Sequence, residues 1–171
     1  MTEHKIRKYR WFWAWQDDKE EAWLGQMSQQ GYHLASFGFP GFYYFTPGEP
    51  RNYVYRLDFV TDTKDYPQYL QLFQDAGWEY LGHMGGWQYF RTLAQEGESQ
   101  EIYTDPDSKI QKYHRLLTFL IIFLPIWVVV LTSDAPYPFY DNLKLLYSVI
   151  TLVYAFAVIQ LFRRILQLKH L

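Results

Sequence analysis

The sequence predicts an α+β domain followed by a two-helix transmembrane hairpin. In the α+β part a strand-helix-strand-strand unit occurs twice, and its strands are expected to form one antiparallel sheet with two helices on one face. Three observations predict this class. Aromatic and glycine patterns recur after about 45 residues. Within each copy, the spacing of apolar residues changes from the two-residue period of a strand to the 3.6-residue period of a helix. Two long stretches near the C-terminus carry no charge.

The internal repeat covers residues 7–45 and 51–91. Its matched pairs include Arg7 with Arg51, Gly31 with Gly77 and Phe45 with Phe90. Self-similarity of this kind predicts that one supersecondary unit is built twice along the chain.

Each copy is expected to begin with a strand in which aromatic or apolar residues alternate. The first strand, RKYRWFWAW at 7–15, places Tyr9, Trp11, Trp13 and Trp15 on one face. The second strand, RNYVYRLDFV at 51–60, places Tyr53, Tyr55, Leu57 and Phe59 on the equivalent face. We expect both faces to pack against the helices as part of the core.

A helix is predicted after each leading strand, at 17–30 and at 65–76, because apolar residues recur there at helical spacing. Asp17 and Asp65 are the expected N-cap residues. Gly31 and Gly77 follow the helices where a left-handed residue commonly ends a helix. A β-hairpin is predicted after each glycine.

Composition excludes several classes of function. The formal net charge is -2 and the pI is near 6.2, so there is no basic field to recruit nucleic acid, and direct DNA or RNA binding is not expected. The chain has no cysteine, which removes disulfides, thiolate metal sites and cysteine nucleophiles. No apolar run of signal-peptide length precedes residue 17, so the α+β domain is expected in the cytoplasm.

Two stretches near the C-terminus, 116–133 and 145–162, each contain about 18 residues without a charge, enough for a helix to cross a bilayer core. Basic residues lie before the first stretch and after the second: Lys109, Lys112, Arg115, Arg163, Arg164 and Lys169. The positive-inside rule therefore predicts a multi-pass protein with both termini in the cytoplasm and a short external loop at 134–142.

The expected domain limits are 1–93 for the α+β domain, 94–114 for a juxtamembrane segment and 115–171 for the membrane hairpin. The segment from Ala94 to Ser108 carries five acidic residues and no basic one, and it is expected to be a solvated tether. The following residues, 109–114, are amphipathic and basic, which suits the surface of an anionic bilayer.

The opposite face of the leading strands is the candidate functional surface. By the two-residue period of a strand, and with additions from the hairpins, its candidate residues are Arg10, Phe12, Tyr43, Arg56, Asp58 and Gln88. The two copies differ here, since Phe12 aligns with Arg56. A binding surface can be built from such differences, whereas the core must be present in both copies; the alternative is a solvated face with salt bridges.

No motif in the sequence indicates a particular catalytic reaction. The glycine pairs lack the lysine and the strand-to-helix context of a phosphate-binding loop. The five histidines are scattered without ligand spacing, and the acidic residues at 17–21 are interpreted as helix-start acids. We therefore expect no metal, no cofactor and no catalytic residue, and the protein is not expected to be an enzyme.

Several motifs together resemble a bacterial membrane family known as domain of unknown function 2812. They are EEAWLGQMSQQGYHL, YVYRLDF, FQDAGWEYLGHMGGWQYFR and EIYTDPDSKIQKY, in this order and at this spacing. The resemblance covers residues 8–113 and implies a bacterial cell-membrane protein with two spans after the domain. Genes of the family often lie beside PadR-type repressors, which implies a regulatory context. The family has no established catalytic residue to carry over.

These features favour a membrane-anchored cytoplasmic sensor or modulator. Its partners would be the lipid bilayer and a small hydrophobic molecule or a regulatory protein, with an indirect effect on transcription or envelope-stress responses. The alternatives are an adaptor that docks a regulator on its open sheet face and an enzyme that acts on a lipophilic substrate. An apolar pocket would favour the sensor, a flat patch the adaptor, and a carboxyl with a shifted pKa the enzyme.

Overall fold

The structure is a computed structural model that describes residues 5–61, 64–95, 100–102, 106–132 and 139–169. The chain divides into two compact units, Met1–Thr104 (unit 1) and Asp105–Leu171 (unit 2). Each unit is described by itself.

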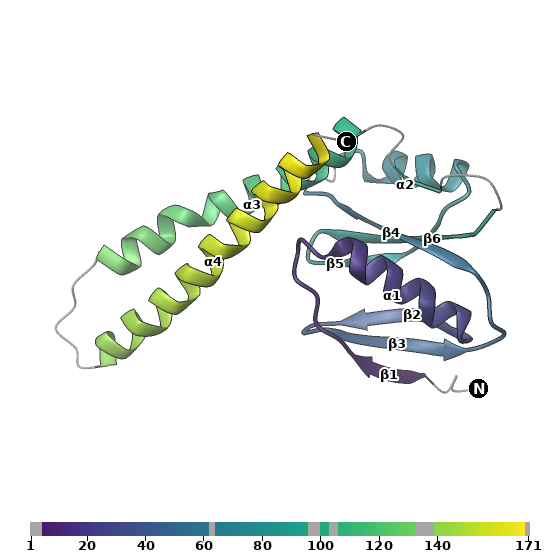
Figure 1. Cartoon of the computed structure of the whole chain (residues 1–171), viewed down its shortest axis with the longest axis horizontal. Coiled ribbons are helices and arrows are strands. Elements are labelled where there is room, and N and C mark those ends of the chain that lie inside the picture. Colours follow the sequence, from purple (N-terminus) through teal and green to yellow (C-terminus); the bar gives the residue numbers. More distant parts are fainter. Residues whose placement is uncertain (1–4, 62–63, 96–99, 103–105, 133–138, 170–171) are drawn as a thin grey trace. The chain divides into compact units, whose positions relative to one another are not determined.

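Unit 1 repeats the order strand, helix, strand, strand, as the sequence predicts (Figure 1). Its elements are β1 (Ile6–Tyr9), α1 (Asp17–Gln29), β2 (Tyr32–Gly38), β3 (Phe42–Pro47), β4 (Tyr53–Phe59), α2 (Tyr66–Asp75), β5 (Glu79–Met84) and β6 (Trp87–Leu93). Both helices lie within about one residue of their predicted limits. The duplicated α+β architecture is therefore confirmed.

The strands form two antiparallel three-stranded sheets, ordered β1-β3-β2 and β4-β6-β5. The prediction of a single sheet is wrong, although β2 and β5 lie against each other where the sheets meet. Both of these strands carry a register shift, between Leu34 and Ser36 in β2 and between Tyr80 and Gly82 in β5. Both shifts lie in the strands at the junction of the two sheets, where a bulge disrupts the ladder and increases the local twist of the strand.

The first leading strand is much shorter than predicted. In the two ladders, Tyr9 pairs with Phe42 and Phe59 pairs with Trp87, each the first residue of the last strand in its copy. Tyr9 therefore corresponds in structure to Phe59 and not to Tyr53. The tryptophan-rich half of the predicted strand lies instead in the connection between β1 and α1.

The tryptophans of this connection are not core residues, contrary to the prediction. Trp11 is 44% exposed and Trp13 is 41% exposed. Alternating aromatic residues are typical of a strand with one buried face, but the same spacing here arranges rings along an irregular segment. Tyr55, Leu57 and Phe59 of β4 are buried as predicted.

Helix α1 packs against β4 and β2 (Figure 1), and its side chains bond to the free edge of β4. The Leu57 amide donates a hydrogen bond to Glu21 Oε1 at 2.8 Å, and the Tyr53 amide donates one to Ser28 Oγ at 3.3 Å. Between them on the same helix face, a Cβ on Gly25 would lie 3.3 Å from the Tyr53 carbonyl oxygen. The helix thereby satisfies edge amides that would otherwise invite another strand.

The two helices pack against opposite faces of the second sheet, so the prediction of two helices on one face is also wrong. Leu57 and Tyr89 are paired across the ladder, and both belong to the core cluster that contains α1. Their neighbour Phe90 belongs to a second cluster with Phe73 of α2 and Trp78. Because successive strand residues point to opposite faces, β4 and β6 are covered on both sides.

The glycines after the helices have the predicted conformation. Gly31 and Gly77 both have a φ of +81°, which an L residue adopts only with strain. A Cβ on Gly31 would also meet the Gly48 carbonyl oxygen at 2.5 Å. The repeat is thus real at the level of the backbone.

The juxtamembrane segment is partly docked on unit 1 and is not wholly solvated as predicted. Ile102 packs against the cluster of Phe73, Trp78 and Phe90. Glu101 forms an ion pair with Arg56 at 3.0 Å. Residues 96–99 and 103–105 of this segment lie outside the described residues.

Unit 2 consists of α3 (Pro106–Thr132) and α4 (Phe139–Lys169), which pack against each other. The Tyr154 hydroxyl of α4 donates a hydrogen bond to the Leu120 carbonyl of α3. Ser148 and Thr151 donate to carbonyls one turn earlier on α4, at 2.8 Å each. These hydroxyl groups of an apolar helix thereby find hydrogen-bond acceptors within the unit.

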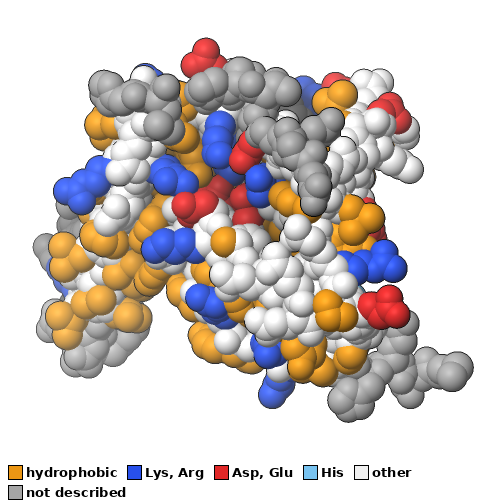
Figure 2. All heavy atoms as spheres, turned by 45° about the vertical axis from the view of Figure 1, so that its right-hand side comes forward, with side chains coloured by type: hydrophobic (Ala, Val, Ile, Leu, Met, Phe, Trp, Pro, Cys, Tyr) orange, Lys and Arg blue, Asp and Glu red, His pale blue; other side chains and the backbone are white. Residues whose placement is uncertain are grey.

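Among the described residues, one helix is long and apolar enough to cross a membrane, the stretch Lys144–Lys169. It contains the second predicted span, and Figure 2 shows hydrophobic side chains spread over the surface of the long helices. The first predicted span, 116–133, is helical as far as Thr132, and the finding for Lys144–Lys169 does not test it, because several of its side chains lie outside the described part of the chain. Residues 134–138 of the predicted external loop lie outside the described residues.

Candidate functional site

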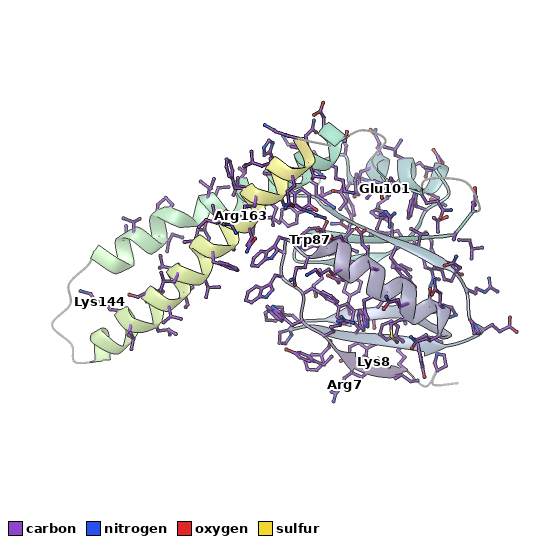
Figure 3. All side chains as sticks on the ribbon, in the orientation of Figure 1. Arg7, Lys8, Trp87, Glu101, Lys144 and Arg163 are labelled. Carbon is purple, nitrogen blue, oxygen red and sulfur yellow. The ribbon has the colours of Figure 1, made fainter. Side chains whose placement is uncertain are left out.

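A pocket of about 220 Å³ opens where the β1–α1 connection meets the tips of both hairpins and the first turn of α1. Its wall is largely aromatic and includes Trp11, Phe12, Trp13, Phe39 and Trp87. Trp87 stands at the start of β6, close to the beginning of α1 (Figure 3). The pocket therefore combines parts of both copies of the repeat.

The tryptophan wall is held by a short turn and by ring contacts. The Gln16 amide donates to the Trp13 carbonyl at 2.8 Å, and the Trp13 amide donates to Gln16 Oε1 at 3.2 Å. Trp13 stacks on Trp15 with ring centroids 5.3 Å apart, and Trp11 meets Trp13 edge to face at 5.7 Å. These contacts form an aromatic surface from residues that are only half-buried.

Two carboxylates from the first turn of α1 lie at the inner end of the pocket, Asp17 and Glu20. Glu20 is 7% exposed, and its Oε1 accepts hydrogen bonds from the Tyr43 and Tyr89 hydroxyls, each at 2.7 Å. Tyr43 comes from β3 and Tyr89 from β6, so this one carboxylate oxygen joins the two sheets. Buried charges need such hydrogen bonds to be tolerated.

Burial raises the pKa of Glu20, although the two tyrosine hydrogen bonds act in the opposite direction and the nearby Asp17 adds to the rise. Burial, together with the charge of Glu20, also raises the pKa of both Tyr43 and Tyr89. The two phenols therefore remain protonated donors at physiological pH. The site presents a carboxyl group whose proton affinity is increased by its surroundings.

Asp17 was expected to cap α1, but Gln16 occupies the N-cap position and makes no side-chain capping bond. Asp17 is the first helical residue and is buried. It lies one turn before Glu20, so the two carboxylates share a face of the helix. The other expected cap, Asp65, does precede α2, again without a side-chain capping bond.

The structure separates the six candidate residues predicted from the sequence. Phe12 and Tyr43 line the pocket. The Arg10 guanidinium lies beside this wall, 5.1 Å from the centroid of the Phe12 ring and 5.3 Å from that of Trp23. The remaining three candidates lie elsewhere in unit 1.

Asp58 and Gln88 are buried beneath α2, so their predicted exposure on an open face is wrong. Asp58 is 3% exposed and accepts a hydrogen bond from the Tyr69 hydroxyl at 3.0 Å. Gln88 Oε1 accepts bonds from the Tyr66 and Tyr80 hydroxyls at 2.7 and 3.1 Å. These polar side chains satisfy the tyrosines of the α2 interface.

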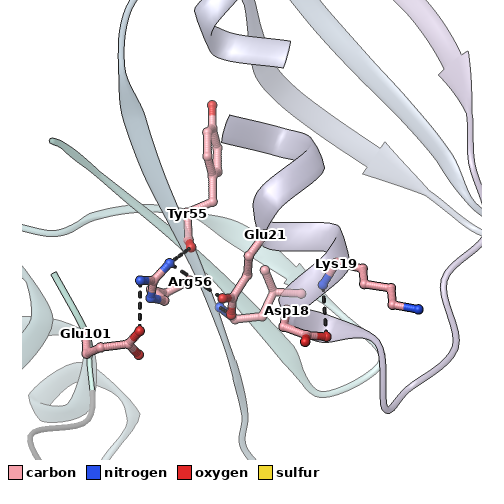
Figure 4. A network of polar contacts seen from close by, with 7 residues as sticks. Asp18, Lys19, Glu21, Tyr55, Arg56 and Glu101 are labelled. Carbon is pink, nitrogen blue, oxygen red and sulfur yellow. Dashed lines mark hydrogen bonds and ion pairs between the residues drawn. The ribbon is translucent and has the colours of Figure 1, made fainter. Parts of the chain in front are cut away.

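Arg56 links α1 to the juxtamembrane segment (Figure 4). Its guanidinium lies 3.6 Å from Glu21 and 3.0 Å from Glu101, and it donates a hydrogen bond to the Tyr55 carbonyl at 2.8 Å. We call Glu21, Arg56 and Glu101 the acidic clasp. Glu21 follows Glu20 directly, so one turn of α1 contacts both the pocket and the clasp.

Sequence reasoning missed the central residue of the site. Glu20 was interpreted as a helix-start acid, yet it precedes Trp23, Leu24 and Met27 at helical spacing, on the buried stripe of α1. An acid on an apolar stripe is the signal that could have identified it. Among the residues that the structure describes, no group of three or more His, Asp or Glu is placed to hold a metal ion.

Comparison with known proteins gives a family match and no activity. The searches of curated proteins and of solved structures found no match. The family model described as protein of unknown function (DUF2812) matches residues 16–124, more than half of the chain. The matched range begins with α1 and so includes Asp17 and Glu20. The chain belongs to the DUF2812 family.

Proposed function

We propose that this protein is a membrane-anchored sensor or modulator whose α+β domain binds a small hydrophobic molecule in the aromatic pocket. The observation that carries the proposal is the convergence of aromatic walls on a buried carboxylate that two tyrosines hold. Apolar pockets with a few convergent polar groups are the usual form of small-molecule sites. At about 220 Å³ the pocket suits a small ligand.

The acidic clasp supports a modulator in which ligand binding reaches the membrane anchor. Glu20 faces the pocket, whereas Glu21 contacts Arg56, and Arg56 also holds Glu101 shortly before α3 begins. A ligand that shifts the first turn of α1 would change the geometry of these ion pairs. The output would then reach transcriptional or envelope-stress regulation indirectly.

The adaptor alternative depended on an open sheet face. In the described part of unit 1 that face of β4 and β6 is covered by α2, and Asp58 and Gln88 are buried there. The pocket therefore favours a small ligand over a flat docking surface.

An enzyme that acts on a lipophilic substrate is the second candidate function. It is favoured by Glu20, because a carboxyl whose pKa is raised in an apolar site can serve as a general acid. Comparison of the molecules bound to the wild type and to Glu20→Gln distinguishes the candidates. An enzyme would leave an uncleaved or unmodified relative of the wild-type molecule on the variant, whereas a sensor would not.

The ligand proposal predicts that Trp13→Ala loses bound small molecules while the domain stays folded. Trp13 is 41% exposed and stacks on Trp15, so the free energy of unfolding should fall by about 1–2 kcal/mol, less than for a fully buried aromatic residue. Its ring forms part of the pocket wall, so a molecule that co-purifies with the detergent-extracted wild type should be strongly depleted. Mass spectrometry of extracted small molecules measures this loss.

The matched control for Trp13→Ala is Leu72→Ala, since Leu72 is an exposed apolar residue of α2 that does not line the pocket. The control should retain the wild-type set of molecules. Equal recovery of every molecule from all three proteins would contradict the proposal.

The membrane arrangement that we propose is a two-helix hairpin with both termini in the cytoplasm. It is supported by the apolar stretch Lys144–Lys169, by the uncharged sequence at 116–133 and by the basic residues that flank the two. The lipid bilayer would be the first partner of the protein.

The absence of native cysteine makes this topology directly testable. A membrane-impermeant maleimide is expected to label Ala135→Cys in intact cells, because residue 135 lies in the predicted external loop. Ala22→Cys, on an exposed position of α1, should be labelled only after lysis. Labelling of Ala22→Cys in intact cells would reverse the proposed orientation.

A further inference from the structure

We propose that the aromatic pocket selects a small organic cation of the quaternary or tertiary ammonium type over neutral and anionic molecules of the same shape. This inference rests on the proposed function, because it names the ligand class of the same pocket.

Charge at the pocket points to a cation. Asp17 and Glu20 both line it, and the described residues that line it include no lysine, arginine or histidine. The Arg10 guanidinium lies over the Phe12 and Trp23 rings, and Arg10 does not line the pocket. A cation that enters would meet two carboxylates in a partly desolvated site, where opposite charges attract more strongly than in water.

The walls suit an ammonium that has few or no hydrogen bonds to offer. Trp11, Trp13 and Trp87 contribute indole rings, the strongest of the aromatic partners for a cation. Glu20 Oε1 already accepts two phenol hydrogen bonds, and the charge of the carboxylate attracts an ammonium whether or not the ammonium donates a hydrogen bond. Alkylated ammonium groups are recognised by this combination of ring faces and negative charge.

Neutral and anionic ligands would gain less from the same walls. A neutral molecule can pack against the indoles, but it would displace water that solvates the carboxylates. Because it has no positive charge, it would not compensate for the lost solvation. An anion would be repelled by both carboxylates. The pocket thus discriminates by charge as well as by shape.

The groups that face Glu20 are Asp17 on its own helix, Tyr43 from β3 and Tyr89 from β6. The positive charge of Arg10 acts on Tyr43, where it opposes the rise in the pKa of the phenol. A bound cation favours the ionised form of Glu20, so binding is coupled to release of its proton. Affinity should therefore rise with pH up to the raised pKa of the free protein and become level above it.

The test uses the full chain in detergent and a pair of probes that differ only in charge, choline and 3,3-dimethylbutan-1-ol. Isothermal titration calorimetry of the wild type should show at least a tenfold preference for choline, about 1.4 kcal/mol. Glu20→Gln keeps the size of the side chain and an acceptor oxygen for both tyrosines. It should reduce the preference to about twofold, since the two probes then differ mainly in the attraction of choline to Asp17 and to the rings.

Glu49→Gln, an exposed carboxyl outside the pocket, is the matched control and should keep the tenfold preference. Equal binding of both probes to the wild type, with loss of both in Trp13→Ala, would overturn the cation inference and leave the ligand-binding proposal intact. Binding of neither probe, together with no molecule lost from Trp13→Ala in the co-purification experiment, would overturn both. Preference for choline that Glu20→Gln retains in full would also overturn the inference.

Discussion

Replacing Phe90 with alanine is expected to lower the free energy of unfolding of unit 1 by about 3–5 kcal/mol. Phe90 is 0% exposed, and its ring stacks on Phe73 of α2 with centroids 4.3 Å apart. Its loss leaves a cavity between β6 and α2, and large-to-small changes in a core lose both the buried surface and the contacts around the cavity. Urea unfolding of the detergent-solubilised chain, followed by tryptophan fluorescence, measures the change.

The repeat provides a matched variant, because Phe45 occupies the equivalent position in β3 and is also 0% exposed. Phe45→Ala is expected to destabilise the unit by a similar amount, but through the cluster that contains Trp23 and Tyr43. Phe39, which is 81% exposed, is the control, and Phe39→Ala should change stability by about 0.5 kcal/mol or less. A loss below about 1 kcal/mol for Phe90→Ala would mean that α2 is not held by this contact.

Glu20→Leu is expected to destabilise unit 1 by about 2–4 kcal/mol at neutral pH, whereas Glu20→Gln should not destabilise it. Leucine leaves the buried Tyr43 and Tyr89 hydroxyls without their shared acceptor, and each orphaned polar group costs about 1–3 kcal/mol. Glutamine keeps the acceptor and removes the buried charge. Urea unfolding of the three proteins at one pH measures both differences.

The pH dependence of stability separates the charge of Glu20 from its hydrogen bonds. Because burial raises its pKa, the folded chain holds this proton more tightly than the unfolded chain, whose value is near 4.5. The stabilisation by the proton is complete below the unfolded pKa and is lost as pH rises through the folded pKa. Glu20→Gln should remove this loss, and an identical pH profile for wild type and variant would show that Glu20 is not the group responsible.

Much of the architecture could be predicted because it depends on sequence patterns within short segments of the chain. Helical spacing located α1 and α2, and glycines in the left-handed region mark their ends at Gly31 and Gly77. The order of elements then follows twice along the chain. These features depend on residues within a few positions of one another, so a single sequence reveals them.

The role of the tryptophans could not be predicted for a definite reason. Alternation between Tyr9 and Trp15 has the period of a strand, and the internal alignment placed these residues against β4. The ladders show that Tyr9 corresponds to Phe59, so Trp11 and Trp13 follow the strand and border the pocket. When the two copies are aligned by residue type alone, Tyr9 matches Tyr53. Only the pairing of the strands shows that Tyr9 corresponds to Phe59.

By itself, the sequence determined the duplicated order of strands and helices, the glycine-terminated helices and an apolar C-terminal helix long enough to cross a membrane. Only the tertiary structure decided what covers each face. Periodicity shows which residues share a face, but the partner of that face comes from distant segments. Glu20 and Tyr89 are 69 residues apart and share a hydrogen bond, and this contact exists because α1 lies along β4, which places a helix-start acid between two sheets.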